Sequence, residues 1–257
     1  MAIVLSCQLM TSCQKAAAVE TTTSSSESES ESEEEDDGIS VGDHIMFDSY
    51  PQRKQDGTDS YDPEPVEWRV LEIRDGNALI ISEYLLDTTA YYYDMADVTW
   101  ETSSIRKWLN DTFYEKTFSE NEKSQILTVS IKNPDNPLYG TPGGNDTEDK
   151  VFCLSLEEAR LYFRDAKDRM AAPTDFALKQ GAAVSDDGML ENGMKTGWWW
   201  LRSPASSANR AADADCYGNI DTEINADRVD GDIVFAETNC VRPVIWITLS
   251  DDIKKAG

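Results

Sequence analysis

The residue types that could do chemistry are few in this 257-residue chain. His44 is the one histidine, and it lies in VGDHIMF (41–47), whose alternation predicts a β-strand. Ser–His–Asp and Cys–His machinery would both need that residue, and GxSxG, GxGxxG and P-loop motifs do not occur. We therefore expect a partly buried strand histidine, no nucleotide cofactor and no enzyme. A cleft holding a carboxylate with a strongly raised pKa would favour an enzyme instead.

An aspartate-rich segment, DADCYGNIDTEI (213–224), partly matches an EF-hand calcium loop. Tyr217 and Ile224 occupy positions that should supply oxygen ligands, and no predicted helices flank the segment, so we exclude an EF-hand. A loosely bound calcium ion stays possible, and a solvated acidic loop is the alternative; no other cofactor or metal is expected. The aspartates concerned are Asp213, Asp215, Asp221, Asp227, Asp230 and Asp232.

The cysteines give no metal or redox motif. No CxxC pair occurs, which excludes a zinc ribbon and a thioredoxin-type site. Cys216 and Cys240 could form a disulfide, or they could be isolated small apolar residues; the sequence leaves both open.

Composition limits the class of partner. The net charge is −26 and no basic stripe interrupts the acidic chain, which excludes nucleic acid as an expected partner. The apolar fraction is 40%, enough for a globular core, and nothing in it sets the oligomeric state.

The N-terminal region reads as an anchor and a spacer. Residues 1–13 are predicted to be a lipoprotein-type signal peptide, in which Met-Thr-Ser-Cys makes Cys13 the lipidated residue; an ordinary secretory signal is the alternative. Residues 14–39 are rich in serine and glutamate and predict a disordered acidic tether. We expect 40–257 to be a single globular domain on a bacterial surface, touching the membrane only through the lipid.

The patterns in residues 40–257 predict an α+β fold. Helices are expected mainly in the middle of the chain, strands near both ends, and a long polar loop region before the last strand. Asp75-Gly76 predicts a tight turn, and Ser119 with Glu122 predicts a capping box. The predicted strands are 41–47, 66–73, 77–86, 150–156, 197–203 and 239–249, with short strands joined by turns in 204–239. The predicted helices are 102–114, 119–127, 155–163 and 173–182.

The run GWWWLRSP (197–204) places three tryptophans on one predicted strand. Trp198 and Trp200 should face one side and Trp199 the other, so both faces are bulky and the strand should be central. We predict structural roles for Trp198, Trp200 and Trp246, and at most one ring, Trp199, lining a ligand site.

Two arginines interrupt apolar strands. An unpaired buried guanidinium is costly, so Arg202 and Arg242 should have structural roles and acidic partners. The candidate partners are Asp146, Asp149 and Glu67.

Over roughly residues 40–250, a series of motifs makes the chain similar to a known family. The chain resembles a bacterial domain family of unknown function that occurs in secreted and surface proteins. That family is similar to the C-type lectin-like fold of formylglycine-generating enzymes and of the variable proteins of diversity-generating retroelements. The motifs are VGDHIMFDSYPQ, VEWRVLEIRDGNALIISEYLLD, VTWETSSIRKWLNDTFY, FSENEKSQI, NPDNPLYGTPGGNDTEDKVFCLSLEEA, PTDFALKQGA, GWWWLRSP and VRPVIWI.

The resemblance implies where a ligand would bind. In those proteins a Trp-rich strand, a polar variable stretch and a closing Arg-Pro strand build the binding face, here Trp198–Arg202, Ala205–Asn239 and Val241–Trp246. This sequence lacks the EPN, QPD and WND triplets of calcium-dependent lectins, and its cysteines do not match the catalytic pair of formylglycine-generating enzymes.

The expected function is therefore a cell-surface lipoprotein binding module. It would present a polar loop face (205–239) to an extracellular protein or glycan ligand. The alternatives are a retroelement target protein, a non-binding structural surface protein and an uncharacterised enzyme. The predicted ligand contacts are Trp199, Asn209, Arg210, Asp213, Asp215, Tyr217, Asn219, Asp221, Asn225, Asp227 and Arg228.

Overall fold

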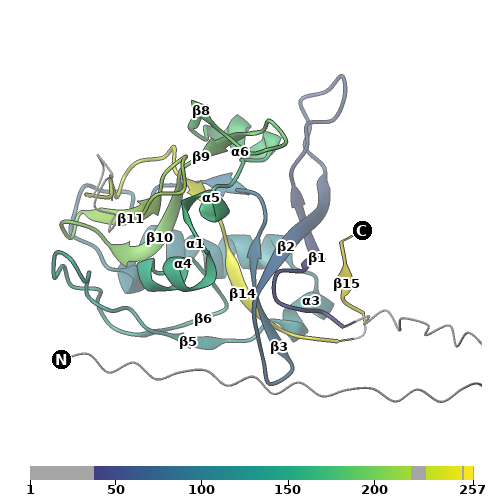
Figure 1. Ribbon diagram of the computed structural model, residues 1–257, viewed down its shortest axis with the longest axis horizontal. Helices are drawn as coiled ribbons and strands as arrows, with labels where there is room; N and C mark the ends of the chain where they lie inside the picture. The colour runs from purple at the N-terminus through teal and green to yellow at the C-terminus, as the bar shows by residue number, and fades with distance from the viewer. Residues whose placement is uncertain (1–37, 221–229, 251, 257) are drawn as a thin grey trace, which may run out of the picture. The chain divides into compact units, whose positions relative to one another are not determined.

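Two β-sheets pack around one continuous hydrophobic core. The computed structural model describes residues 38–220, 230–250 and 252–256, which belong to one compact unit (Figure 1). The predicted signal peptide with Cys13, and the tether as far as residue 37, lie outside the described residues. So do four predicted ligand contacts, Asp221, Asn225, Asp227 and Arg228.

The first sheet contains the predicted hairpin. Asp75 and Gly76 have φ angles of 52° and 75°, the left-handed pair that a tight two-residue turn with the strand twist requires. The Asp-Gly prediction is thus confirmed. The sheet order is β15 (Lys254–Lys255), β1 (His44–Pro51), β2 (Pro63–Arg74), β3 (Asn77–Ser82), β14 (Val244–Thr248) and β7 (Val151–Phe152).

The second sheet has the tryptophan strand at its centre. All six residues of β10 are buried, as expected for a strand covered on both faces. The sheet order is β12 (Asp232–Ile233), β11 (Arg210–Ala214), β10 (Trp199–Pro204), β13 (Cys240–Val241) and β4 (Asp87–Thr88). Two-stranded ribbons complete the strands: β5 (Val129–Ile131) with β6 (Thr147–Asp149), and β8 (Val184–Met189) with β9 (Lys195–Gly197).

Two predicted strands are each divided in the structure. Trp198 lies between β9 and β10 and is half-buried, so the alternation argument applies only from Trp199 onward. The stretch 239–249 breaks at Arg242-Pro243, where the chain leaves the second sheet and enters the first. Proline has no N–H for a ladder bond, which suits it to this corner.

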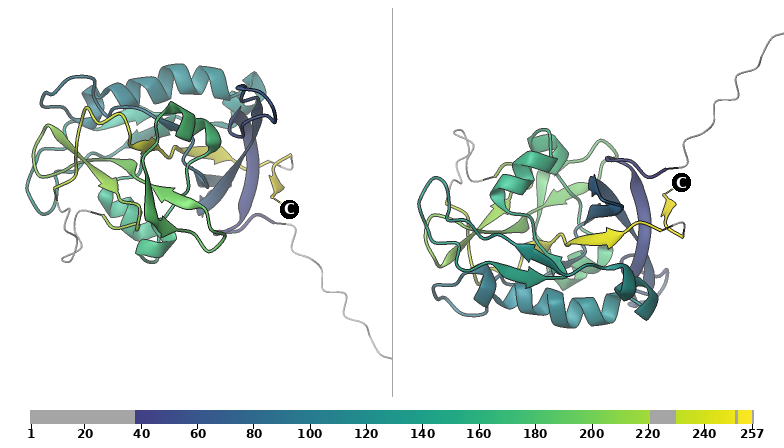
Figure 2. Two further views of the ribbon diagram at one scale, coloured as in Figure 1. Left: turned by 90° about the horizontal axis from the view of Figure 1, so that it is seen from above. Right: turned by 90° about the horizontal axis from the view of Figure 1, so that it is seen from below.

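The helices lie mainly in the middle of the chain, so the α+β prediction is confirmed. A continuous helix over residues 104–117 contains a π-turn and runs along one side of the unit (Figure 2). The Ser119–Glu122 capping box is present. No helix in the described part of the chain has the length and apolar character that crossing a membrane requires. The helices are η1 (Trp100–Thr102), α1 (Ser104–Trp108), η2 (Leu109–Phe113), α2 (Tyr114–Thr117), α3 (Glu120–Gln125), α4 (Leu156–Tyr162), α5 (Ala166–Arg169) and α6 (Asp175–Gln180).

Candidate functional site

Loops from distant parts of the sequence meet at one end of the unit, at the left of Figure 1 and of both views in Figure 2. We call this region the loop end. It consists of residues 89–99, 132–146, 205–209 and 230–239, all of which the structure describes.

Backbone hydrogen bonds tie the first loop to two of the others. The Tyr92 N–H donates to the Val234 carbonyl at 2.7 Å, and the Val98 N–H donates to the Ala208 carbonyl at 2.8 Å. Without these bonds the two backbone N–H groups would lie against the core with no hydrogen-bond acceptor. The loops therefore form a connected surface.

The second loop is tied to the end of β10. Asn136 is buried, and its Nδ2 donates to the Pro204 carbonyl at 2.8 Å while its Oδ1 accepts the backbone N–H groups of Leu138 and Tyr139. One asparagine thus shapes the loop tip and attaches it to the central strand.

Large apolar side chains are exposed at the loop end. Tyr93 and Met95 are each 68% exposed and Leu138 is 56% exposed. Tyr139 and Phe235 are also exposed. Exposed apolar groups gathered on a positioned surface are typical of an interaction site.

The same loops are acidic. Their one base, Lys132, is ion-paired with Asp146. The acids are Asp94, Asp97, Asp135, Asp146, Asp230, Asp232 and Glu237. A partner with a basic rim would complement this surface.

Arg202 anchors the strand behind the loop end. Its guanidinium pairs with both carboxylate oxygens of Glu158 and also donates to the carbonyls of Cys153 and Lys132 at 2.8 and 3.1 Å. The expectation of an acidic partner is confirmed, but none of the three candidate residues supplies it. The reason is that α4 packs against β10 and brings in Glu158, which also completes the capping box with Ser155.

Two of the predicted acidic partners, Asp149 and Glu67, interact with other basic side chains. Asp149 pairs with Arg106, with 2.7 Å between Nε and Oδ1, and it also accepts from Trp100 Nε1 at 2.9 Å. Glu67 lies 2.6 Å from His44 Nδ1. His44 is thus a partly buried strand residue, as expected, and it also has Glu67 as a partner.

Arg242 is fully buried where the two sheets meet. It donates to the carbonyls of Ser82 and Arg169 at 2.9 and 3.2 Å, and its guanidinium lies 5.2 Å from the Trp199 ring centroid. Burial lowers the pKa of this guanidinium to about 10, and Glu83, 3.9 Å away, opposes that shift. Arg242 is therefore satisfied mainly by backbone carbonyls and aromatic rings.

The structure places Trp199 in the core and corrects its prediction as a ligand contact. It is 0% exposed, its Nε1 donates to the Arg169 carbonyl at 3.2 Å, and its ring packs near Phe163. Trp200 is equally buried and donates to the Thr89 carbonyl at 2.8 Å. Trp246 is buried too, with Arg74 over its ring.

The other predicted contacts that the structure describes lie at two separate places. Asn209 lies within the loop end and Arg210 directly after it; both are half-buried, and Arg210 donates to the Gly231 carbonyl at 2.7 Å. Asp215, Tyr217 and Asn219 follow the opposite end of β11, about 17 Å away for a strand of this length.

The second group is mainly a folded turn. Asp215 accepts the backbone N–H groups of Tyr217 and Asn219 at 2.8 and 2.9 Å, so its carboxylate holds the turn together. Asp213 is buried within β11. Of this group Tyr217 alone is well exposed, at 46%.

The structure also bears on the predicted disulfide and on the aspartates proposed for calcium. Cys216 and Cys240 are buried and are not joined by a disulfide, so the disulfide alternative is wrong, and burial raises the pKa of the Cys240 thiol. Among the described aspartates, histidines, cysteines and glutamates, no three come close enough to hold a metal ion. Asp221 and Asp227 of the proposed calcium set lie outside the described part.

Tyr93 and Met95, the exposed apolar residues of the first loop, were not among the predicted ligand contacts. Tyr93 and Met95 follow two tyrosines that are mostly buried, in the run AYYYDMAD (90–97). This run has neither strand nor helix periodicity, and its aromatic residues are followed by two aspartates and a methionine. That pattern could have indicated an exposed loop tip.

Comparison with known proteins gives a family and no function. The model of a domain of unknown function, DUF6273, matches residues 75–249. The chain belongs to the DUF6273 family. The matched range contains the second sheet, the strands β3, β7 and β14 of the first sheet, and the four loops of the loop end, whereas β1, β2 and β15 lie outside it. No curated protein and no solved structure matches the chain.

Proposed function

We propose that this DUF6273 protein is a binding module that presents the loop end to an extracellular protein. The observation that carries the proposal is the exposure of Tyr93 and Met95 on a loop fixed by hydrogen bonds to its neighbours. Aromatic residues and methionine are enriched in the centres of protein interfaces. Methionine and leucine offer a sugar no hydrogen bonds, which favours a protein over a glycan.

The location and the finer fold are part of the same proposal. A lipid on Cys13 and the acidic tether would hold the domain away from a bacterial membrane. The C-type lectin-like resemblance is supported by the second sheet, in which the tryptophan strand, the polar stretch and the closing strand are neighbours. The loop end lies beside these strands, as the resemblance implies for a binding face.

An array of extracellular proteins and glycans, probed with the full chain, tests the proposal. Tyr93→Ser should lose its protein spots, with at least a tenfold weaker signal, because it removes a central aromatic contact. Tyr217→Ser is the matched control, since that tyrosine is exposed near the other end of β11.

The opposite pattern would contradict the proposal. If Tyr217→Ser abolished binding and Tyr93→Ser did not, the ligand would lie at the Asp215 turn. Uniformly weak binding that neither substitution changes would indicate a surface protein without a specific ligand.

A further inference from the structure

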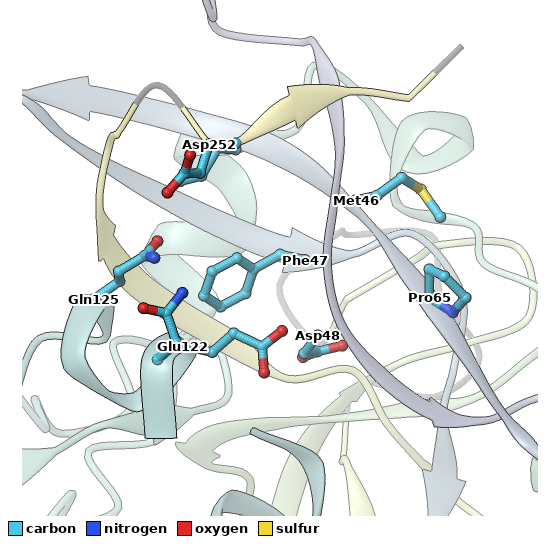
Figure 3. A pocket seen from close by; sticks show the side chains of 9 residues that line it. Met46, Phe47, Asp48, Pro65, Glu122, Gln125 and Asp252 are labelled. Atoms are coloured by element: carbon cyan, nitrogen blue, oxygen red, sulfur yellow. The ribbon is translucent and has the colours of Figure 1, made fainter. Parts of the chain in front are cut away.

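A second site lies away from the loop end, between β1, α3 and the segment before β15 (Figures 1 and 3). It is a pocket of about 250 Å³. The nine residues that line it include no lysine, arginine or histidine, and the side-chain polar atoms come from carboxylates and carboxamides. They are Met46, Phe47, Asp48, Pro65, Asn121, Glu122, Gln125, Asp252 and Ile253.

Asp48 is the unusual member of this set. It is 8% exposed, and no donor of the described chain meets either carboxylate oxygen with hydrogen-bond geometry. The nearby Trp68 indole lowers the pKa of this carboxyl slightly, but its Nε1 donates to the Phe47 carbonyl at 2.9 Å. A buried carboxylate without a partner is costly, so such a group is expected to meet a ligand or to hold a proton. The backbone of Asp48 is also unusual, with a φ angle of 64°. Asp48 lies between Met46 and Ser49, where the register of the β1–β2 pairing shifts.

Two more acceptors face the same space. Figure 3 shows the Glu122 carboxylate directed toward Asp48, and its Oε2 is held by the Ser119 N–H at 2.7 Å. The Gln125 side-chain oxygen is buried without a partner. The walls between these oxygens are apolar, from Phe47 and Ile253 among others.

These groups define the ligand by its chemistry. Oxygen acceptors with net negative charge call for a cation that donates hydrogen bonds. The described acids are not clustered closely enough for a metal ion, and the pocket is several times the volume of one water molecule. A primary ammonium has three donors, and an alkyl stem would lie against the apolar walls.

We propose that this pocket binds a primary alkylammonium group, carried either by a free amine or by a lysine side chain of another polypeptide. The ammonium would lie between Asp48 and Glu122, with Gln125 as a third acceptor. The proposal is independent of the loop end and of its partner.

Asp48 also meets the condition set above for an enzyme. Burial raises the pKa of its carboxyl well above the usual value, and the Glu122 charge adds to the rise. The pocket nevertheless contains no serine, cysteine, lysine or histidine, and Glu122 is engaged in the helix cap. Among the described groups, the arrangement therefore favours binding over catalysis.

Binding should couple to the proton on Asp48. An ammonium favours the ionised carboxylate, so affinity should rise with pH until Asp48 is ionised in the free protein. Other charged side chains on the elements around β1 also contribute to the local field. They are Glu64, Glu67, Arg69, Glu72 and Arg74 on β2, Glu115 and Lys116 on α2, Glu120, Glu122 and Lys123 on α3, Asp252, and Lys254 and Lys255 on β15.

The test is an NMR titration of the full chain with n-pentylammonium at pH 7.5. Saturable shifts should appear at the amides of Phe47 and Gln125. Asp48→Asn should weaken binding at least tenfold, and asparagine tolerates the left-handed backbone. Glu122→Gln should weaken it several-fold while keeping the capping box, since glutamine can replace glutamate there. Asp56→Asn, an exposed change outside the pocket, is the control and should alter affinity less than twofold.

Other ligands distinguish the sources and the competing explanations. A blocked lysine peptide that binds tenfold tighter than n-pentylammonium indicates a polypeptide lysine, and weaker peptide binding indicates a free amine. Tetramethylammonium, which has no N–H donor, should not bind. Equal binding of tetramethylammonium, unchanged affinity in Asp48→Asn, no saturable shift with n-pentylammonium, or calcium shifting these amides when the amine does not would overturn the proposal.

Discussion

Asp48 shows how one buried carboxyl links stability to pH. Its pKa in the folded chain is well above the ordinary value of 3.8, mainly because burial disfavours the charge. Between the unfolded and folded pKa values the folded state holds a proton that the unfolded state releases. The free energy of unfolding therefore falls as pH rises through this window. The stability that the protonated Asp48 carboxyl contributes is fully present only at pH values below the pKa of the unfolded state.

We predict that Asp48→Asn stabilises the protein at pH 7 and not at pH 3. The gain should be at least about 1 kcal/mol, since each pKa unit corresponds to roughly that free energy. Urea unfolding at both pH values measures it. Equal stability of the two proteins at pH 7 would show that Asp48 is satisfied by a partner in solution.

Arg202 gives a second prediction at the residue scale. Arg202→Ala should lower the free energy of unfolding by about 3–5 kcal/mol, because it leaves Glu158 and the Cys153 and Lys132 carbonyls without their donor. Arg53→Ala, at an exposed arginine, is the control and should change stability by less than about 0.5 kcal/mol. Thermal or urea unfolding compares them, and similar small losses would contradict a structural role for Arg202.

At the scale of elements, the turn after β11 is packed against α5. Gly218 has φ 76°, and a Cβ there would lie 1.8 Å from the Ala166 carbonyl oxygen. Gly57 has a similar φ of 73° with open space around it. Substituting alanine at Gly57 therefore measures the free-energy cost of the left-handed backbone alone. The same change at Gly218 adds the cost of the contact with Ala166.

We predict that Gly57→Ala costs about 1–2 kcal/mol, the penalty of a left-handed alanine, and that Gly218→Ala costs about 1–3 kcal/mol more. The additional loss reflects displacement of α5 from the turn. Urea unfolding of both variants provides the measurement. If the two losses were equal, α5 would be free to move away from the turn at little cost.

At the scale of the whole molecule, the described part of the chain has an acidic surface at the loop end and an acidic pocket around Asp48. Binding of a basic protein at the loop end should weaken about tenfold when the salt concentration rises from 0.05 to 0.5 M, chiefly through a slower association rate. Surface plasmon resonance with a partner from the array measures this. A salt-independent association rate would contradict electrostatic steering by the loop-end acids.

Local signals in the sequence predicted local structure well. Asp75-Gly76 predicted the hairpin because few residue pairs adopt two successive positive φ angles, and Ser119–Glu122 predicted a helix start because both capping bonds span three residues. The need of Arg202 for an acidic partner was also predictable, since burial of a guanidinium is costly wherever it occurs. The identity of that partner was not, because β10 and α4 approach each other only in the folded chain.

The sites depended on tertiary structure even more. The polar stretch 205–239 looked like one surface, yet β11 runs through it and sends Asn209 and Tyr217 to opposite ends. Asp48 resembled any other acid among the 49 in the chain.

The sequence by itself determined the α+β class, the turns, the caps and the acidity, since these follow from backbone conformation and composition at short range. The tertiary structure decided which loops meet, which carboxylate pairs with which guanidinium, and which acid is buried without a partner. The physical reason is that burial and ion pairing depend on groups far apart in the chain, which come together only after folding. Arg202 pairs with Glu158, and Asp48 lies in a pocket with Glu122.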